Sequence, residues 1–137
     1  MIGPLLFLAA AAAATDFGPS PLVPPGHASR WTVAEDNEEI TGWLDEAWRG
    51  ETVIEGVRYK QVLVRSAVKG SEQMVIDGIA IVDCAGRRLG MQRLYMIKSS
   101  QGNNMEVPLD GLELSAPEDE SADGIILEFA CGTGAAR

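Results

Sequence analysis

The alternation of apolar and polar residues predicts β-strands through the middle of the chain. In residues 74–84 every second position is apolar or small, and this inward-facing set is Met74, Ile76, Gly78, Ala80, Val82 and Cys84. A period of two is typical of a strand that packs on one face. Residues 57–68, which are rich in β-branched side chains, and residues 87–98, which alternate in the same way, are predicted to be two further strands.

The connections between these three strands are short. Residues 69–72 separate the first strand from the second, and Ala85 and Gly86 separate the second from the third. A parallel crossover needs about a dozen residues, so connections of this length permit only antiparallel hairpins. The sequence therefore predicts a three-stranded antiparallel meander at the centre of the protein.

Weaker patterns precede and follow the meander. Residues 31–33 are predicted to begin a first strand and residues 40–45 to form another short one. The acidic run 35–39 is typical of a solvated turn or loop. Residues 47–56 contain two glycines that favour turns, and residues 107–114 could hold a short edge element.

The apolar run 125–131 lies near the end of the chain. It fits a terminal helix with a broad buried face, capped by Ser121 or Asp123. The run is short, so a strand fits it as well. With the helix, the predicted fold class is α+β, a small antiparallel sheet with a C-terminal helix.

Residues 1–14, MIGPLLFLAAAAAA, are typical of a secretory signal peptide. Ala12 and Ala14 form the small-x-small pattern that predicts cleavage after Ala14. The run is too short to span a bilayer, which needs about 20 apolar residues. Thr15 stands where a lipoprotein would need cysteine. We therefore expect an exported protein, located in the periplasm or at the cell surface.

The rest of the chain is expected to be a linker and one domain. Four prolines and two glycines in residues 15–29 predict an extended linker, and residues 30–137 form a single small domain. The net charge of −9 lies entirely after the leader. Nucleic acids and anionic lipids bind to clustered Lys and Arg, so this charge argues against both as partners.

Cys84 and Cys131 allow one intramolecular disulfide, with two free thiols as the alternative. Export would place the chain where a disulfide persists. The sequence contains no CxxC motif, which argues against a thioredoxin-type redox site and a paired-cysteine zinc site.

Catalytic residues are not indicated. The one histidine, His27, falls in the predicted linker, where a mobile ring could not hold the geometry of a general base. The GxSxG, GxxxxGK[ST] and HExxH motifs are missing from the sequence. We therefore predict a non-enzymatic protein without a cofactor.

Residues 119–124 (DESADG) resemble the start of a calcium-binding loop. The side-chain oxygens of Asp119, Ser121 and Asp123 stand at alternate positions, with Gly124 at the turn. The match fails at its twelfth position, where Ala130 replaces the bidentate Glu. An acidic loop with a helix cap is the preferred interpretation, and a metal site is the alternative.

Three tryptophans cluster at the start of the domain. Trp31 and Trp43 are predicted to lie in the core, because tryptophan in a small β-domain buries a large area. Trp48 lies between Glu46 and Arg49, so both a core position and a surface position remain open.

Three arginines follow the first cysteine in sequence. They could pair with Asp77 or Asp83 across the hairpin, or form a basic patch for an anionic ligand. We expect ion pairs for this set, which is Arg87, Arg88 and Arg93.

Taken in order, these motifs resemble the surface-adhesin protein E-like family of exported bacterial proteins. The resemblance covers about residues 30–132. It rests on the export signal, an early tryptophan (Trp31) and an aromatic-aliphatic-Asp step (Trp43-Leu44-Asp45). A long strand then ends in Asp-Cys (Asp83, Cys84) and is followed by arginines (Arg87, Arg88). A tyrosine on the next strand (Tyr95) and a late Cys-Gly (Cys131, Gly132) complete the pattern.

The resemblance implies an antiparallel sheet, a helix near the C-terminus, a Cys84–Cys131 disulfide and a role in binding host extracellular proteins. Two departures limit it. The founding member is lipid-anchored, whereas this chain has no lipobox cysteine, and the family's basic ligand-binding segment has no match here, so no binding residues are assigned. We expect an adhesin-like interaction module of the cell envelope; the alternative is a periplasmic small-ligand or calcium-binding module. The oligomeric state is not indicated.

Overall fold

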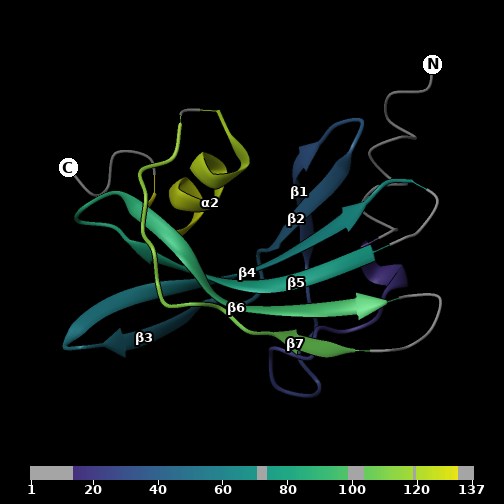
Figure 1. Ribbon diagram of the computed structural model, residues 1–137, viewed down its shortest axis with the longest axis horizontal. Helices are drawn as coiled ribbons and strands as arrows, with labels where there is room; N and C mark the ends of the chain where they lie inside the picture. Colours follow the sequence, from purple (N-terminus) through teal and green to yellow (C-terminus); the bar gives the residue numbers. More distant parts are fainter. Residues whose placement is uncertain (1–13, 71–73, 99–103, 119, 133–137) are drawn as a thin grey trace.

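The protein is built on a seven-stranded antiparallel sheet with a C-terminal helix packed on it (Figure 1). The computed structural model describes residues 14–70, 74–98, 104–118 and 120–132. The sheet order is β1-β2-β4-β5-β6-β7, and β3 pairs with β4 beside this path. The elements are β1 (Trp31–Asp36), β2 (Ile40–Asp45), β3 (Gly50–Ile54), β4 (Val57–Val68), β5 (Met74–Asp83), β6 (Arg88–Lys98), β7 (Met105–Val107) and α2 (Ala122–Cys131).

The predicted meander is confirmed as β4, β5 and β6. These strands are antiparallel neighbours over most of their length, with Val62 opposite Ala80 and Val82 opposite Leu89. Their bounds match the predicted ranges almost residue for residue, because alternating apolar positions specify both the strands and the face that they bury.

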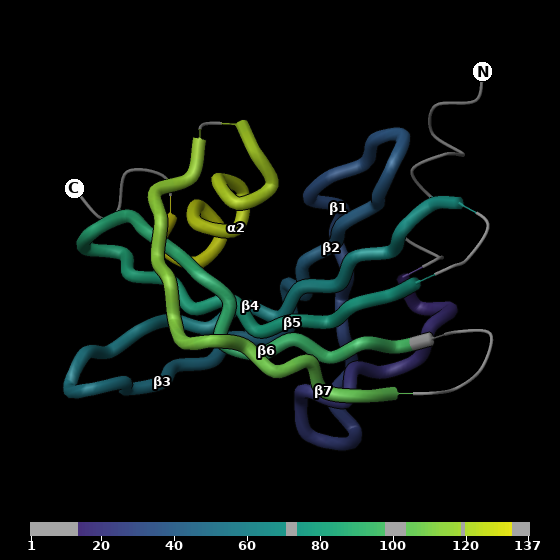
Figure 2. Tube along the Cα trace, in the orientation of Figure 1, coloured from purple at the N-terminus to yellow at the C-terminus, as the bar shows by residue number. Residues whose placement is uncertain are grey.

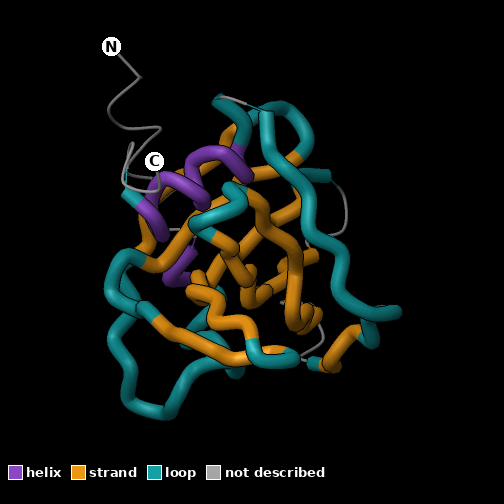
Figure 3. The backbone as a smooth tube through the Cα atoms, turned by 90° about the vertical axis from the view of Figure 1, so that its left-hand side faces the viewer, coloured by secondary structure: helices purple, strands orange, loops and turns teal. Residues whose placement is uncertain are grey.

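The C-terminal run forms a helix, which settles the open choice between helix and strand. Ser121 is the N-cap residue, and its hydroxyl oxygen accepts a hydrogen bond from the N–H of Gly124 at 3.1 Å. At the other end the N–H of Gly132 donates to the carbonyl oxygen of Glu128 at 2.7 Å. Helix α2 lies across one face of the sheet (Figure 3), and this side of the core comprises Leu44, Val62, Ala80, Val82, Leu89, Ile126, Leu127 and Ala130.

The other face of the sheet is covered by residues 14–30, which we call the N-terminal strap. Residues 15–29 were predicted to be an extended linker, but the strap packs on the sheet, with Leu22 and Val23 buried against Leu63 and Ile79. Its prolines remove helical and strand periodicity without preventing an extended chain from burying apolar side chains. The strap is therefore part of the folded domain.

This second layer also corrects the prediction that β5 packs on one face. Val75, Ile79 and Ile81, on the face opposite the helix, are as completely buried as Ala80 and Val82 on the helix face. The strap and the neighbouring tryptophans exclude water from that side. The strand is thus covered on both faces.

Three further differences concern the ends of the sheet. Strand β1 continues through Glu35 and Asp36, which were predicted to lie in a turn, because Asp36 accepts hydrogen bonds from Thr41 and Lys69. Strand β3 was not predicted, and β7 begins before the expected edge element. After β7 the chain runs back past β6, where Ser115 forms an isolated bridge with Leu89, and then enters α2 (Figure 2).

The disulfide is confirmed: Cys84, just after β5, is joined to Cys131 at the end of α2. It links the helix covalently to the sheet that it covers. Among the described residues, no helix has the length and apolar character needed to cross a bilayer.

Candidate functional site

A fully buried ion pair lies at the centre of the face that the strap covers. Arg65 on β4 and Asp77 on β5 stand opposite each other in the sheet register, and both side chains are 0% exposed. The guanidinium donates in a bidentate manner, with Nε 2.7 Å from Oδ1 and Nη2 2.8 Å from Oδ2 of Asp77. Such a pair is stable inside a protein only when its remaining donors are also bonded.

The strap supplies the missing acceptors. Nη1 of Arg65 donates to the carbonyl oxygen of Ala14 at 2.6 Å and to that of Gly18 at 2.8 Å. The ring of Trp31 lies against the guanidinium, 4.7 Å from its centroid to the carbon Cζ. This cluster therefore attaches the strap to the sheet. The hydrogen bonds of the Arg65 guanidinium go to Asp77 and to the backbone of the strap.

A second buried carboxylate, Asp45, holds the end of the strap. It accepts hydrogen bonds from the N–H of Arg30 at 2.9 Å and of Ala47 at 2.8 Å, and from Nε2 of His27 at 2.9 Å. His27 was expected to be mobile, but this contact fixes its ring, whose side chain is 16% exposed. Burial raises the pKa of Asp45, yet the hydrogen bonds from Arg30, the Ser29 hydroxyl, His27 and Ala47 outweigh burial and lower that pKa below its usual range.

Asp45→Asn is expected to lower the free energy of unfolding by about 1–3 kcal/mol at pH 7, because the amide cannot replace all of these bonds. A carboxylate whose pKa is lowered in the folded state stabilises the fold above its unfolded pKa, and this contribution is lost as the pH falls through the folded value. The stability difference between wild type and variant should therefore shrink below about pH 4. Urea unfolding at a series of pH values measures it.

Asp83→Asn is the matched control, because Asp83 is a less buried carboxylate that accepts hydrogen bonds in the β5–β6 turn. We expect a smaller loss for this variant. A difference between wild type and Asp45→Asn that stayed constant down to about pH 2 would contradict the assignment of the stability to the carboxylate.

The 119–124 loop serves as the start of a helix. The hydroxyl of Ser121 donates to the carbonyl of Glu118 at 2.6 Å and accepts from Gly124, so its oxygen is engaged on both sides. Asp123 lies in the first turn of α2, where an acid suits the helix dipole. Asp119 lies outside the described residues, and within them no group of three or more His, Cys, Asp or Glu side chains is placed to hold a metal ion.

The predictions for the tryptophans and arginines are borne out in part. Trp43 is buried, as predicted, and Trp31 and Trp48 are half-buried beside the strap cluster. Arg88 pairs with Asp83 at 3.4 Å, as expected. Asp77, the other carboxylate expected to pair with these arginines, pairs with Arg65, which the sequence spacing did not single out. Arg93 pairs with Glu106 on β7.

The β3–β4 hairpin projects from the sheet and forms an exposed surface that the sequence did not predict. Glu55 and Gly56 form its two-residue turn, both with positive φ (50° and 82°), which is the geometry of a tight hairpin. Val53 is 60% exposed and Val57 is 47% exposed at this tip. Within the described residues, β3 pairs with β4 alone, so its outer edge is open.

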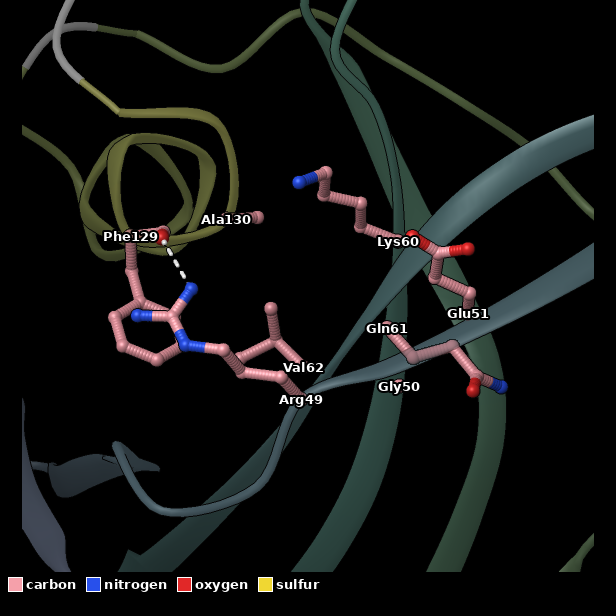
Figure 4. A pocket seen from close by; sticks show the side chains of 8 residues that line it. All are labelled: Arg49, Gly50, Glu51, Lys60, Gln61, Val62, Phe129 and Ala130. Atoms are coloured by element: carbon pink, nitrogen blue, oxygen red, sulfur yellow. Dashed lines mark hydrogen bonds between the residues drawn. The ribbon is translucent and has the colours of Figure 1, made fainter.

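A groove separates this hairpin from the C-terminal end of α2 (Figure 4). Its volume is about 330 Å³, and Arg49 and Lys60 stand at its sides. The remaining lining comes from the two hairpin strands and the last turns of the helix: Gly50, Glu51, Gln61, Val62, Phe129 and Ala130. No signal in the sequence pointed to this groove, because its two walls are about seventy residues apart in the chain.

No protein-family model, curated protein or solved structure matches this chain. The similarity to the surface-adhesin protein E-like family therefore stays a hypothesis. The function has to be argued from the hairpin, the groove and the disulfide.

Proposed function

We propose that the protein is an exported, non-enzymatic interaction module of the cell envelope, which binds a protein partner through the β3–β4 hairpin. The observation that carries this proposal is the open edge of β3 beside two exposed valines, Val53 and Val57. An unpaired strand edge offers a row of backbone donors and acceptors to an extended segment of another chain.

The other edges of the sheet are less suited to this role. Strand β1 carries a register shift between Val33 and Glu35 and two acidic side chains, Glu35 and Asp36, which are devices that protect an edge. Strand β7 has three residues. The β3 edge combines an apolar tip with five strand residues, so it is the preferred docking edge.

Export is supported by the leader and by the Cys84–Cys131 disulfide, since disulfides persist in oxidising compartments. A non-enzymatic role is supported by the use of the polar buried groups. Asp45, His27, Arg65 and Asp77 are bonded to one another or to backbone groups that close the fold.

The location is tested by protease treatment of intact cells that produce a tagged copy. Digestion without lysis is expected if the domain is displayed outside the cell; protection until the envelope is opened would exclude an adhesin role. The mass of the exported chain identifies the cleavage point. Cleavage after Ala14, as the leader predicts, would remove one acceptor of the buried Arg65 and leave the carbonyl oxygen of Gly18 as the remaining contact of Nη1 with the strap.

Binding is tested with purified extracellular-matrix proteins and the variant Val53→Pro. Val53 faces Arg58 in the pair next to the hairpin-closing pair, a position whose N–H points away from β4. The proline should abolish binding, because it removes an outward donor and leaves the β3–β4 ladder intact. Val53→Thr keeps the outward N–H and the β-branched shape at the same position, so it is the control and should bind better than Val53→Pro. Equal binding by Val53→Pro and wild type would overturn the proposed edge.

A further inference from the structure

The groove beside the hairpin carries positive charge on a strongly acidic protein. The chain has a net charge of −9, yet Arg49 and Lys60 both line this cleft. Glu51 is the one acidic residue of its lining, and its Oε1 accepts a hydrogen bond from Arg58 outside the groove at 3.1 Å. The lining therefore holds two cations, Arg49 and Lys60, against one carboxylate, which has a cationic neighbour of its own in Arg58.

Arg49 is held in place by the helix. Its guanidinium carbon lies 4.2 Å from the centroid of the Phe129 ring, and Nη1 donates to the carbonyl oxygen of Phe129 at 3.4 Å (Figure 4). Stacking on an aromatic ring fixes the plane of the guanidinium and leaves its other N–H groups for a ligand. A donor fixed in advance loses less conformational entropy when it binds.

Lys60 is the second cation, on the β4 side of the groove. Its side chain extends over the groove toward the end of α2 (Figure 4). In the described part of the chain, no hydrogen bond or ion pair engages its ammonium group. Lys60 faces Glu51 across the β3–β4 ladder, on the same face of the sheet as Val62 and α2.

The base of the groove is apolar. Val62 and Ala130 are buried, and the Phe129 ring forms part of the wall. The last turn of α2 contains no basic side chain, so Arg49 and Lys60 also offset the negative end of the helix dipole. That structural role would affect stability, whereas a ligand role would affect binding, so experiment can separate the two.

We propose that this groove binds a carboxylate attached to a compact apolar group, with Arg49 and Lys60 holding the anion and Val62, Phe129 and Ala130 contacting the apolar part. The inference rests on the proposed function insofar as the groove adjoins the β3–β4 hairpin, which is the proposed docking surface. The carboxylate would belong to a free organic acid or to the C-terminal residue of a partner chain.

The probe is hippurate, an aromatic acid with one carboxylate, titrated into the ¹⁵N-labelled domain and followed by NMR. We expect its binding to shift the amide signals of Gly50 and Gln61. The uncharged hippuramide should bind about tenfold more weakly, because it lacks the charge-assisted hydrogen bonds. Absence of hippurate binding, or equal binding of hippuramide, would overturn the proposal.

Two variants and a control locate the site. Arg49→Gln and Lys60→Gln should each weaken hippurate binding by about tenfold. Lys69→Gln makes the same change in net charge at the far end of β4, where Lys69 is bonded to Asp36, and should leave binding unchanged. An equal loss in all three variants would show an effect of net charge alone and would reject the groove.

A peptide of five residues ending in phenylalanine with a free carboxylate distinguishes the two sources. Tighter binding than N-acetylphenylalanine would identify a chain terminus that also pairs with β3, and equal binding would identify a free acid; either outcome supports the groove. If Val53→Pro abolishes partner binding while hippurate fails to bind, the proposed function stands and this inference alone falls.

Discussion

Replacing Asp77 by Asn is expected to lower the free energy of unfolding by about 3–5 kcal/mol, because the guanidinium of Arg65 would remain buried without its counter-charge. The pair is bidentate and 0% exposed on both sides, so water cannot solvate the orphaned cation. Urea unfolding of the oxidised domain, monitored by tryptophan fluorescence, measures the loss. Trp31 should report it directly, since its ring lies against the guanidinium.

The control is an ion pair of similar geometry on the surface. Arg93 donates in a bidentate manner to Glu106, but both side chains are nearly half exposed, at 45% and 47%. Glu106→Gln should therefore cost far less stability than Asp77→Asn, because water and salt screen a surface pair. Similar losses for Asp77→Asn and Glu106→Gln would contradict the argument that burial makes the Arg65–Asp77 pair critical.

A double variant separates the charge from the packing. Arg65→Met with Asp77→Leu leaves no buried charge, so it should be less destabilised than Asp77→Asn alone. Full recovery is not expected, because the carbonyl oxygens of Ala14 and Gly18 lose their donor. The strap should then become more susceptible to proteolysis than the rest of the domain.

The central strands could be predicted because their pattern is local. Alternation in residues 57–68 and 74–84 specified the strands, and the short turns between them left one topology. The strap could not be found in the same way, because its prolines remove every period. One signal for it was nevertheless present: Val75, Ile79 and Ile81 make the second face of β5 too apolar to face water.

The candidate site depends on contacts that no local pattern encodes. Gly50 and Gly56 both favoured turns: Gly56 does lie in the hairpin turn, whereas Gly50 is the first residue of strand β3. The groove exists because Arg49 meets Phe129 across eighty residues of chain. The partner of Asp77 was missed because only the arginines after Cys84 were considered for Asp77 and Asp83; the pairing with Asp83 holds for Arg88, whereas Asp77 pairs with Arg65 on β4.

Removing the disulfide is expected to have an effect of comparable size. The variant Cys84→Ser/Cys131→Ser should lose about 4 kcal/mol, because the bond closes a loop with a sequence separation of 47 residues and so restricts the unfolded chain. The measurement is urea unfolding of the variant beside the wild type in oxidising and reducing buffer. Reductant should destabilise the wild type to the level of the variant and leave the variant unchanged.

The loss of stability should be greatest at the C-terminal end of α2, because Cys131 ends the helix that carries both Phe129 and Ala130. Without the bond, α2 is held by its buried side chains Ile126, Leu127 and Ala130 and by the contact of Arg49 with Phe129, and its last turn can fray. We therefore expect the variant to bind hippurate more weakly even where it is fully folded. An unchanged urea midpoint, or two free thiols in the exported protein, would contradict the stabilising role of the bond; unchanged binding would show that the helix end does not depend on it.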